Sequence, residues 1–215
     1  MIFNYDEAQE TLFPVKEIIT DYACAKKVEL AVIRKISGGA LDISRLCYYS
    51  DMERREMTIL GFLRIGFKIG SQVTDMLTND TVRTITKSAK KVSNESGFFK
   101  EFLRFSEYNG VLVAIIEPKN FVLPMISGHF CDRFPDEQFL IYDKSHKFAF
   151  VYQDGKKRLI PLTHLKLSET GVKEEEIRTL WKQFYNTIAV EGRINLKLRM
   201  SNMPKRYWTH MTEFN

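Results

Sequence analysis

The fold of this chain is decided by the stretch FFKEFLRFSEYNGVLVAIIE, residues 98–117. Two apolar runs, 98–107 and 111–117, have the character of β-strands and flank Tyr108-Asn109-Gly110. Asn-Gly between two such runs is a strong signal for a tight hairpin turn, because both residues tolerate a positive φ. The stretch therefore predicts an antiparallel β-hairpin.

The segments that follow extend this sheet. A short helix is expected over 120–132, since Pro118 precedes it and Pro135 lies just beyond it. Two further apolar runs, 139–142 and 147–153, predict a second hairpin, and a turn at 153–156 leads into a last strand over 158–161. Hairpin, helix and meander together predict an α+β fold with a mostly antiparallel sheet of four to five strands.

Helical patterns precede the sheet. Residues 17–35 are good helix formers that stop at Ser37-Gly38-Gly39. Ser50 and Glu53 have the spacing of a capping box for a helix through about residue 67, which is apolar nearly all round and is expected at the centre of the core. Another helix is expected to start at Asp80 as its N-cap, with a buried stripe at Val82, Ile85, Ala89 and Val92.

A strongly amphipathic helix follows the sheet. Its apolar positions recur at helical spacing, and Glu174, Glu175 and Glu176 occupy its first turn, where the helix dipole favours acidic residues. The apolar residues are Ile177, Leu180, Trp181, Phe184, Tyr185 and Ile188. We found no repeat or linker, so we expect one domain, 1–215, with a helical part (1–96), a sheet part (97–165) and a C-terminal helix with a basic tail (166–215).

Composition restricts the partners and the compartment. The 215-residue chain carries a net charge of +5 with a pI near 9.0, a moderate bias towards polyanions such as nucleic acid. Cys24, Cys47 and Cys131 are too widely spaced for a metal or redox motif and are expected to be reduced thiols of a cytoplasmic protein. The first ten residues do not read as a secretion signal, and no apolar run reaches membrane-spanning length.

The C-terminal tail is the densest basic and aromatic segment. Arginine and lysine bind phosphates, and tyrosine and tryptophan stack on bases. The residues concerned are Arg193, Lys197, Arg199, Lys205, Arg206, Tyr207 and Trp208. A second interpretation fits the same residues: the two aromatic side chains are buried to dock the tail, and the charges are solvated.

Two other basic stretches leave a similar choice open. Arg83, Lys87, Lys90 and Lys91 gather on one face of the helix predicted from residue 80, as phosphate-binding or as merely solvated side chains would. In the first predicted strand, Lys100 and Arg104 alternate with Phe98 and Phe102 on one face. Single-strand binders use such alternation, but a strand buried on both faces shows it as well.

The sequence offers no convincing active site. It lacks the glycine-rich nucleotide loops and the paired metal-ligand motifs, so no catalytic residue, metal or cofactor is assigned. Pro135-Asp136 starts a nuclease-like pattern, which fails because the later acid and lysine, Asp143-Lys144, are adjacent. His129, Arg133 and Asp143 remain as residues of a pocket at the end of the sheet, although His129 and Arg133 also fit a structural pair bracing a helix end.

Several motifs spread from about residue 12 to the C-terminus resemble an uncharacterised bacterial family of probable DNA metabolism proteins. They are Phe102-Leu103-Arg104-Phe105-Ser106-Glu107, Gly110-Val111-Leu112, Pro124, His129-Phe130, Arg133-Phe134-Pro135, Ile141-Tyr142-Asp143, Leu180-Trp181-Lys182, Phe184, Thr187-Ile188, Arg193, Asn195 and Met203-Pro204-Lys205-Arg206-Tyr207-Trp208. The chain departs from the family pattern in a shorter N-terminal segment, and Gly97, Phe98 and Glu101 stand where members carry a His-Arg pair and a Gly. The resemblance implies a setting in DNA repair or modification, beside a radical-SAM protein or a uracil-DNA-glycosylase-like domain, with no established activity.

Three functional hypotheses follow. The first is a nucleic-acid-binding accessory protein that contacts single- or double-stranded DNA through the basic, aromatic C-terminal surface. The second is a subunit that docks a catalytic partner, such as a radical-SAM protein or a glycosylase. The third, an enzyme acting on a base or nucleotide, lacks a visible nucleophile or metal site.

Overall fold

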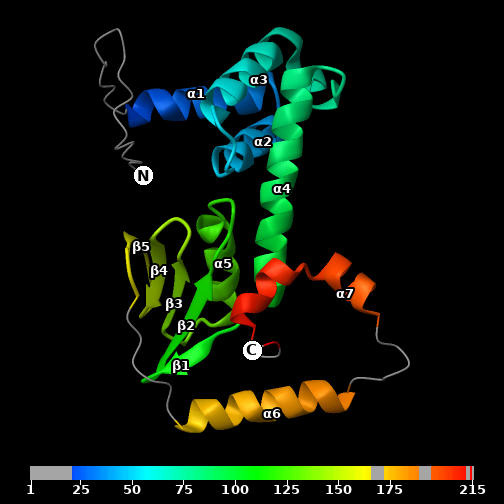
Figure 1. Cartoon of the computed structure of the whole chain (residues 1–215). Coiled ribbons are helices and arrows are strands. Elements are labelled where there is room, and N and C mark those ends of the chain that lie inside the picture. The colour runs from blue at the N-terminus through cyan, green and yellow to red at the C-terminus, as the bar shows by residue number, and fades with distance from the viewer. Residues whose placement is uncertain (1–20, 166–171, 189–194, 212–213, 215) are drawn as a thin grey trace, which may run out of the picture.

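The computed structural model describes residues 21–165, 172–188, 195–211 and 214 (Figure 1). The first half is helical, with α1 (Tyr22–Lys35), α2 (Gly38–Tyr48), α3 (Arg55–Ile69), the 3-10 helix η1 (Gly70–Asp75) and α4 (Asp80–Phe102). The middle contains β1 (Ser106–Tyr108), β2 (Val111–Ile116), α5 (Leu123–Arg133), β3 (Phe139–Asp143), β4 (Phe148–Gln153) and β5 (Lys156–Pro161). The C-terminal part contains α6 (Val172–Ile188), α7 (Leu196–Asn202) and the 3-10 helix η3 (Lys205–His210).

The predicted α+β class is confirmed. The five strands lie in the order β1-β2-β3-β4-β5, and every neighbouring pair is antiparallel except β2 and β3. These two strands are parallel because α5 connects them as a crossover. The hairpin turn between β1 and β2 lies at Asn109 and Gly110, as predicted, with φ values of 53° and 81°.

The long helix α4 corrects the predicted strand over 98–107. The helix continues through Phe102, and β1 begins only at Ser106. The buried stripe of α4 explains the extension, because Val92, Ser96 and Phe99 keep the helical period into the aromatic run. Lys100, Phe102 and Arg104 therefore do not share one face of a strand. The expected boundary at 96/97 falls inside this helix.

The starts of the N-terminal helices differ from the predictions. Helix α1 ends at Lys35 as expected, but Ser37 then caps α2 by accepting a hydrogen bond from the Ala40 amide at 3.0 Å. The predicted capping box at Ser50 does not form, because the Ser50 hydroxyl donates to the Cys47 carbonyl at 2.6 Å and α3 begins at Arg55. The N-cap of α4 is Asn79, one residue before the predicted Asp80.

Helix α3 is not the central helix that its composition predicts. Of its side chains only Phe62 is fully buried, and Gly66 lies against Ile36. Met57 is 64% exposed, and Leu60 and Phe67 are also exposed. The helix has one face on its helical neighbours, so the rest of its apolar surface faces solvent.

Two hydrophobic clusters form the core, and α4 contributes to both. Val82 and Ile85 pack with α1, α2 and α3, whereas Val92 and Phe99 pack with the sheet and α5. Figure 1 shows α4 running from the helical group to the sheet, with η3 against its C-terminal half. None of the helices in the described ranges is long and apolar enough to cross a membrane.

Candidate nucleic-acid interface

Tyr207 anchors η3 to the end of α4. Its side chain is 6% exposed, and its ring centre lies 5.0 Å from that of Phe99 and 5.4 Å from that of Phe98. Burial raises the pKa of the Tyr207 hydroxyl above its ordinary value of 10.0. The ring is therefore part of the core, and in this arrangement it is not available to stack on a base.

Trp208 is half-buried and also makes contacts within the chain. Its indole nitrogen donates to the Met203 carbonyl at 3.0 Å, and its ring stacks on Phe214 with centres 4.3 Å apart. The ammonium group of Lys205 lies 6.0 Å from the centre of the Trp208 ring. Tyr207 and Trp208 thus both pack within the chain, as expected if they dock the tail.

Arg206 pairs with a buried carboxylate of α4. Its guanidinium lies 3.2 Å from Oε1 of Glu95, a residue that is only 2% exposed, and also bonds the Tyr207 hydroxyl. Glu95 also accepts hydrogen bonds from the Lys119 amide at 3.1 Å, from the Asn120 amide at 2.9 Å and from the Asn120 side chain. One carboxylate thus joins α4, the segment that follows β2, and η3.

These contacts place Arg206 in line with the basic face of α4. Arg83, Lys87 and Lys91 are exposed and follow one another at intervals of four residues, and Glu95 is the next position of the same row. Arg206 binds Glu95 and so continues the row, which spans about 18 Å at 1.5 Å per residue. We call these four cations, Arg83, Lys87, Lys91 and Arg206, the basic ridge. Lys90 is exposed beside it.

The three α4 cations of the basic ridge border a cavity of about 400 Å³. Arg83, Lys87 and Lys91 line one side, and Asp51 and Met52 of the α2–α3 loop line the other. Arg83 is partly neutralised by Asp80, whose carboxylate lies 2.5 Å away.

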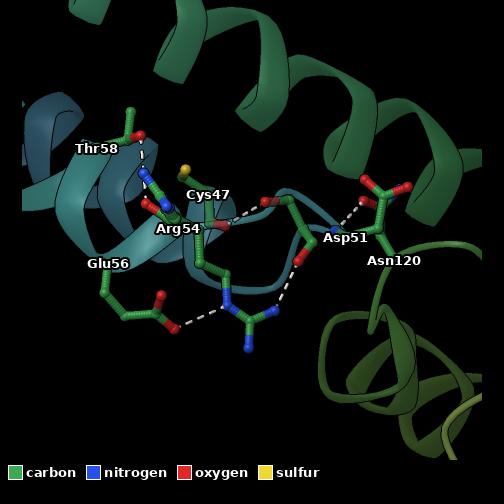
Figure 2. A network of polar contacts seen from close by, with 8 residues as sticks. Cys47, Asp51, Arg54, Glu56, Thr58 and Asn120 are labelled. Carbon is green, nitrogen blue, oxygen red and sulfur yellow. Dashed lines mark hydrogen bonds and ion pairs between the residues drawn. The ribbon is translucent and has the colours of Figure 1, made fainter. Parts of the chain in front are cut away.

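A network of polar contacts fixes the α2–α3 loop (Figure 2). The Asp51 amide donates to Oδ1 of Asn120 at 3.1 Å, and the Arg55 guanidinium donates to the Ser50 carbonyl at 2.7 Å. Asn120 thereby contacts both Glu95 and the loop. Asn120 therefore connects the two walls of the cavity, the α2–α3 loop and α4.

The third basic stretch lies at the C-terminal end of α4. Arg104 borders the same small cavity as Arg206 and Tyr207, and it also borders a larger cavity together with Lys100 and Arg133. Lys197 and Arg199 lie on α7, upstream of η3, and Arg193 lies outside the described residues. The structure therefore gathers Arg206 with the α4 cations and brings Arg104 to the end of that row.

The predicted pocket of His129, Arg133 and Asp143 does not assemble. Arg133 ends α5 near the start of β3, whereas Asp143 is the buried last residue of β3. His129 is exposed and packs edge-on against Phe130. The two ends of the five-residue strand β3 are well separated, so Asp143 lies apart from Arg133, which comes just before the start of that strand.

Asp143 has a different partner, which sequence reasoning missed. Its carboxylate lies 2.8 Å from Nδ1 of His146 and accepts a hydrogen bond from the His146 amide at 3.0 Å. The pair closes the β3–β4 turn. In the described part of the chain, no three His, Cys, Asp or Glu side chains gather as metal ligands do.

Glu95 and Asn120 were not singled out by sequence reasoning either. A signal for Glu95 was present, since it stands within the apolar stripe between Val92 and Phe99, where a carboxylate needs buried partners. The partners themselves lie far along the chain, so no local pattern names them.

The comparisons with known proteins identify a family and no function. A family model described as a domain of unknown function, DUF4130, matches residues 53–213. No curated protein and no solved structure gives a significant match to the chain. The matched region covers most of the chain, from the α2–α3 loop through η3. The chain therefore belongs to the DUF4130 family.

Proposed function

We propose that this protein binds the sugar-phosphate backbone of nucleic acid along the basic ridge, as an accessory protein in DNA repair or modification. The observation that carries the proposal is the Arg206–Glu95 pair, which aligns a cation from the C-terminus with three cations of α4. Over about 18 Å, one strand of duplex DNA presents about five phosphates, so the four cations of the ridge have the length to contact several neighbouring phosphates of one strand. The DNA repair setting comes from the resemblance of the sequence.

The test is fluorescence anisotropy with labelled single- and double-stranded DNA at several salt concentrations. Four phosphate contacts predict that log K falls with log salt at a slope of about −2.8 on single strands and about −3.6 on duplex. The double variant Lys87→Gln/Lys91→Gln removes two contacts and should flatten the slope by about 1.4 to 1.8.

A matched control separates the ridge from net charge. Lys156 and Lys157 are exposed on β5, the edge strand that lies farthest in the strand order from β1, the strand that follows α4. Lys156→Gln/Lys157→Gln changes the net charge equally and should leave the slope near that of the wild type. Equal slopes for the two double variants, or binding that does not depend on salt, would contradict the proposal.

A second candidate function is a subunit that docks a catalytic partner such as a radical-SAM protein or a glycosylase. It is supported by apolar side chains exposed on neighbouring helices, Val28 on α1 and Met57, Leu60 and Phe67 on α3. Co-expression with such a radical-SAM protein or glycosylase should give a complex, and the double variant Met57→Lys/Phe67→Lys should break it. Separate elution of the two wild-type proteins would exclude a stable complex.

A further inference from the structure

A cavity of about 530 Å³ lies where the end of α4, the end of α5 and α6 meet. Its size falls within the range of pockets that hold small organic ligands. Arg104 lines this cavity and also the small cavity that Arg206 and Tyr207 border. Arg104 therefore lies between the pocket and Arg206, the last cation of the basic ridge.

One wall of the pocket is aromatic and fixed. The Phe105 ring packs edge-on against Phe130, Phe134 and Phe139, with ring centres 5.3, 5.5 and 5.7 Å away. Trp181 of α6, 40% exposed, lines the cavity as well. Planar apolar surfaces of this kind accept the face of a nucleobase.

Hydrogen bonds hold α6 at the edge of the pocket. The Arg178 guanidinium donates to the Ser106 hydroxyl at 2.6 Å, and Glu174 accepts from the Glu107 amide at 3.3 Å. Arg178 and Glu174 also pair with each other at 3.0 Å. Their charges are therefore largely used within the wall itself.

The remaining charges of the pocket are mainly positive. Lys100, Arg104 and Arg133 face one further carboxylate, that of Glu101. The Arg133 guanidinium lies 5.6 Å from the centre of the Phe134 ring, so a cation and an aromatic face stand side by side. A ligand with a flat ring and a phosphate suits this pocket, because the ring can pack on the aromatic side chains and the phosphate can bind the cations.

We infer that this pocket holds one unpaired nucleotide of a single strand, with its base against Phe105 and Trp181 and its phosphate at Arg104 and Arg133. The inference rests on the proposed function, because the basic ridge would carry the strand to the pocket. It adds a recognition step that a backbone-binding ridge lacks, since stacking requires a base that has left its duplex.

The experiment compares twelve-nucleotide single strands with abasic strands of the same length and charge. One stacked base should tighten binding by about 5- to 150-fold, whereas the ridge alone binds both strands equally. Trp181→Ala should remove most of the preference, because only the Phe105 ring then remains, and Trp181→Phe should retain more of it. Leu180→Ala is the matched control, since Leu180 is 63% exposed on the same helix and does not line the pocket.

A second readout separates the pocket from the ridge. In a Trp208→Phe background, Trp181 is the only tryptophan of the chain, and deoxythymidine monophosphate should quench its emission. Quenching should survive Lys87→Gln/Lys91→Gln but weaken in Arg133→Gln. Equal affinity for normal and abasic strands, with a steep salt slope, would overturn the pocket and leave the ridge. Failure to bind any strand at low salt would overturn the proposed function instead, and the pocket would stand only if the mononucleotide still quenches Trp181.

Discussion

Replacing Glu95 by glutamine tests whether this carboxylate joins the helical part, the sheet and η3. Glu95 is 2% exposed and accepts from the Lys119 amide, the Asn120 amide, the Asn120 side chain and Arg206. Glutamine keeps the volume but removes the charge, and it presents an NH₂ group to donors that need an acceptor.

The magnitude follows from these contacts. Two buried Asn120 hydrogen bonds weaken from charge-assisted to neutral, by about 1 kcal/mol each, and a donor facing the new NH₂ group costs about 1–3 kcal/mol. The Arg206 side chain is 42% exposed, so solvent screening holds its share to less than about 1 kcal/mol. Relief of the buried charge offsets part of the loss. We expect Glu95→Gln to lower the free energy of unfolding by about 2–4 kcal/mol.

Urea unfolding followed by far-ultraviolet circular dichroism measures this difference. Glu101→Gln, exposed on the same helix, is the matched control and should change stability by less than about 0.5 kcal/mol. A double-mutant cycle of Glu95→Gln with Arg206→Gln should give a coupling below about 1 kcal/mol, because the buried amides carry the energy. The reasoning would be refuted if Glu95→Gln and Glu101→Gln were equally stable.

Three further predictions concern packing, alkaline pH and thiol access. Gly66→Ala should lower the free energy of unfolding by about 1–3 kcal/mol, because the added Cβ would lie 2.7 Å from Cδ1 of Ile36. Gly97→Ala should raise it by about 0.5–1 kcal/mol, because a Cβ there would meet no neighbouring side chain within 4 Å. Urea midpoints that do not separate the two variants would contradict this. Burial holds the pKa of Tyr207 above its ordinary 10.0, so the unfolded state loses this proton first and stability falls as pH rises through that range. Tyr207→Phe should therefore lose less thermal stability than the wild type between about pH 9 and pH 11, and parallel melting curves would count against it. A thiol reagent should modify Cys24 quickly in the native protein and all three cysteines only after unfolding; three fast thiols in the native state would be inconsistent with the burial of the other two.

Short-range patterns predicted much of the sheet correctly. Asn109-Gly110 specifies its turn through backbone freedom, and the apolar runs that became β3, β4 and β5 are separated by polar turn residues. The same reasoning failed over 98–102, because clustered phenylalanines suit a strand and a buried helix equally well. Tyr207 and the sheet pack around Phe99, and that contact decides for the helix.

The amphipathic period failed in a different way for α3. Its apolar residues predicted a central helix, but the neighbouring helices leave Met57 and Phe67 exposed. The periodicity of a sequence shows which side chains of a helix are apolar, but not which of them become buried. Which of them find a partner depends on the arrangement of the other helices.

The sequence by itself determined that this protein is a basic α+β chain with a row of cations on α4, because helical spacing is a local property of the backbone. Only the tertiary structure decided that Arg206 extends that row and that Tyr207 is a core residue. The reason is physical: buried Glu95 requires several hydrogen-bond donors, and the chain supplies them from residues 119–120 and from Arg206, far away in sequence.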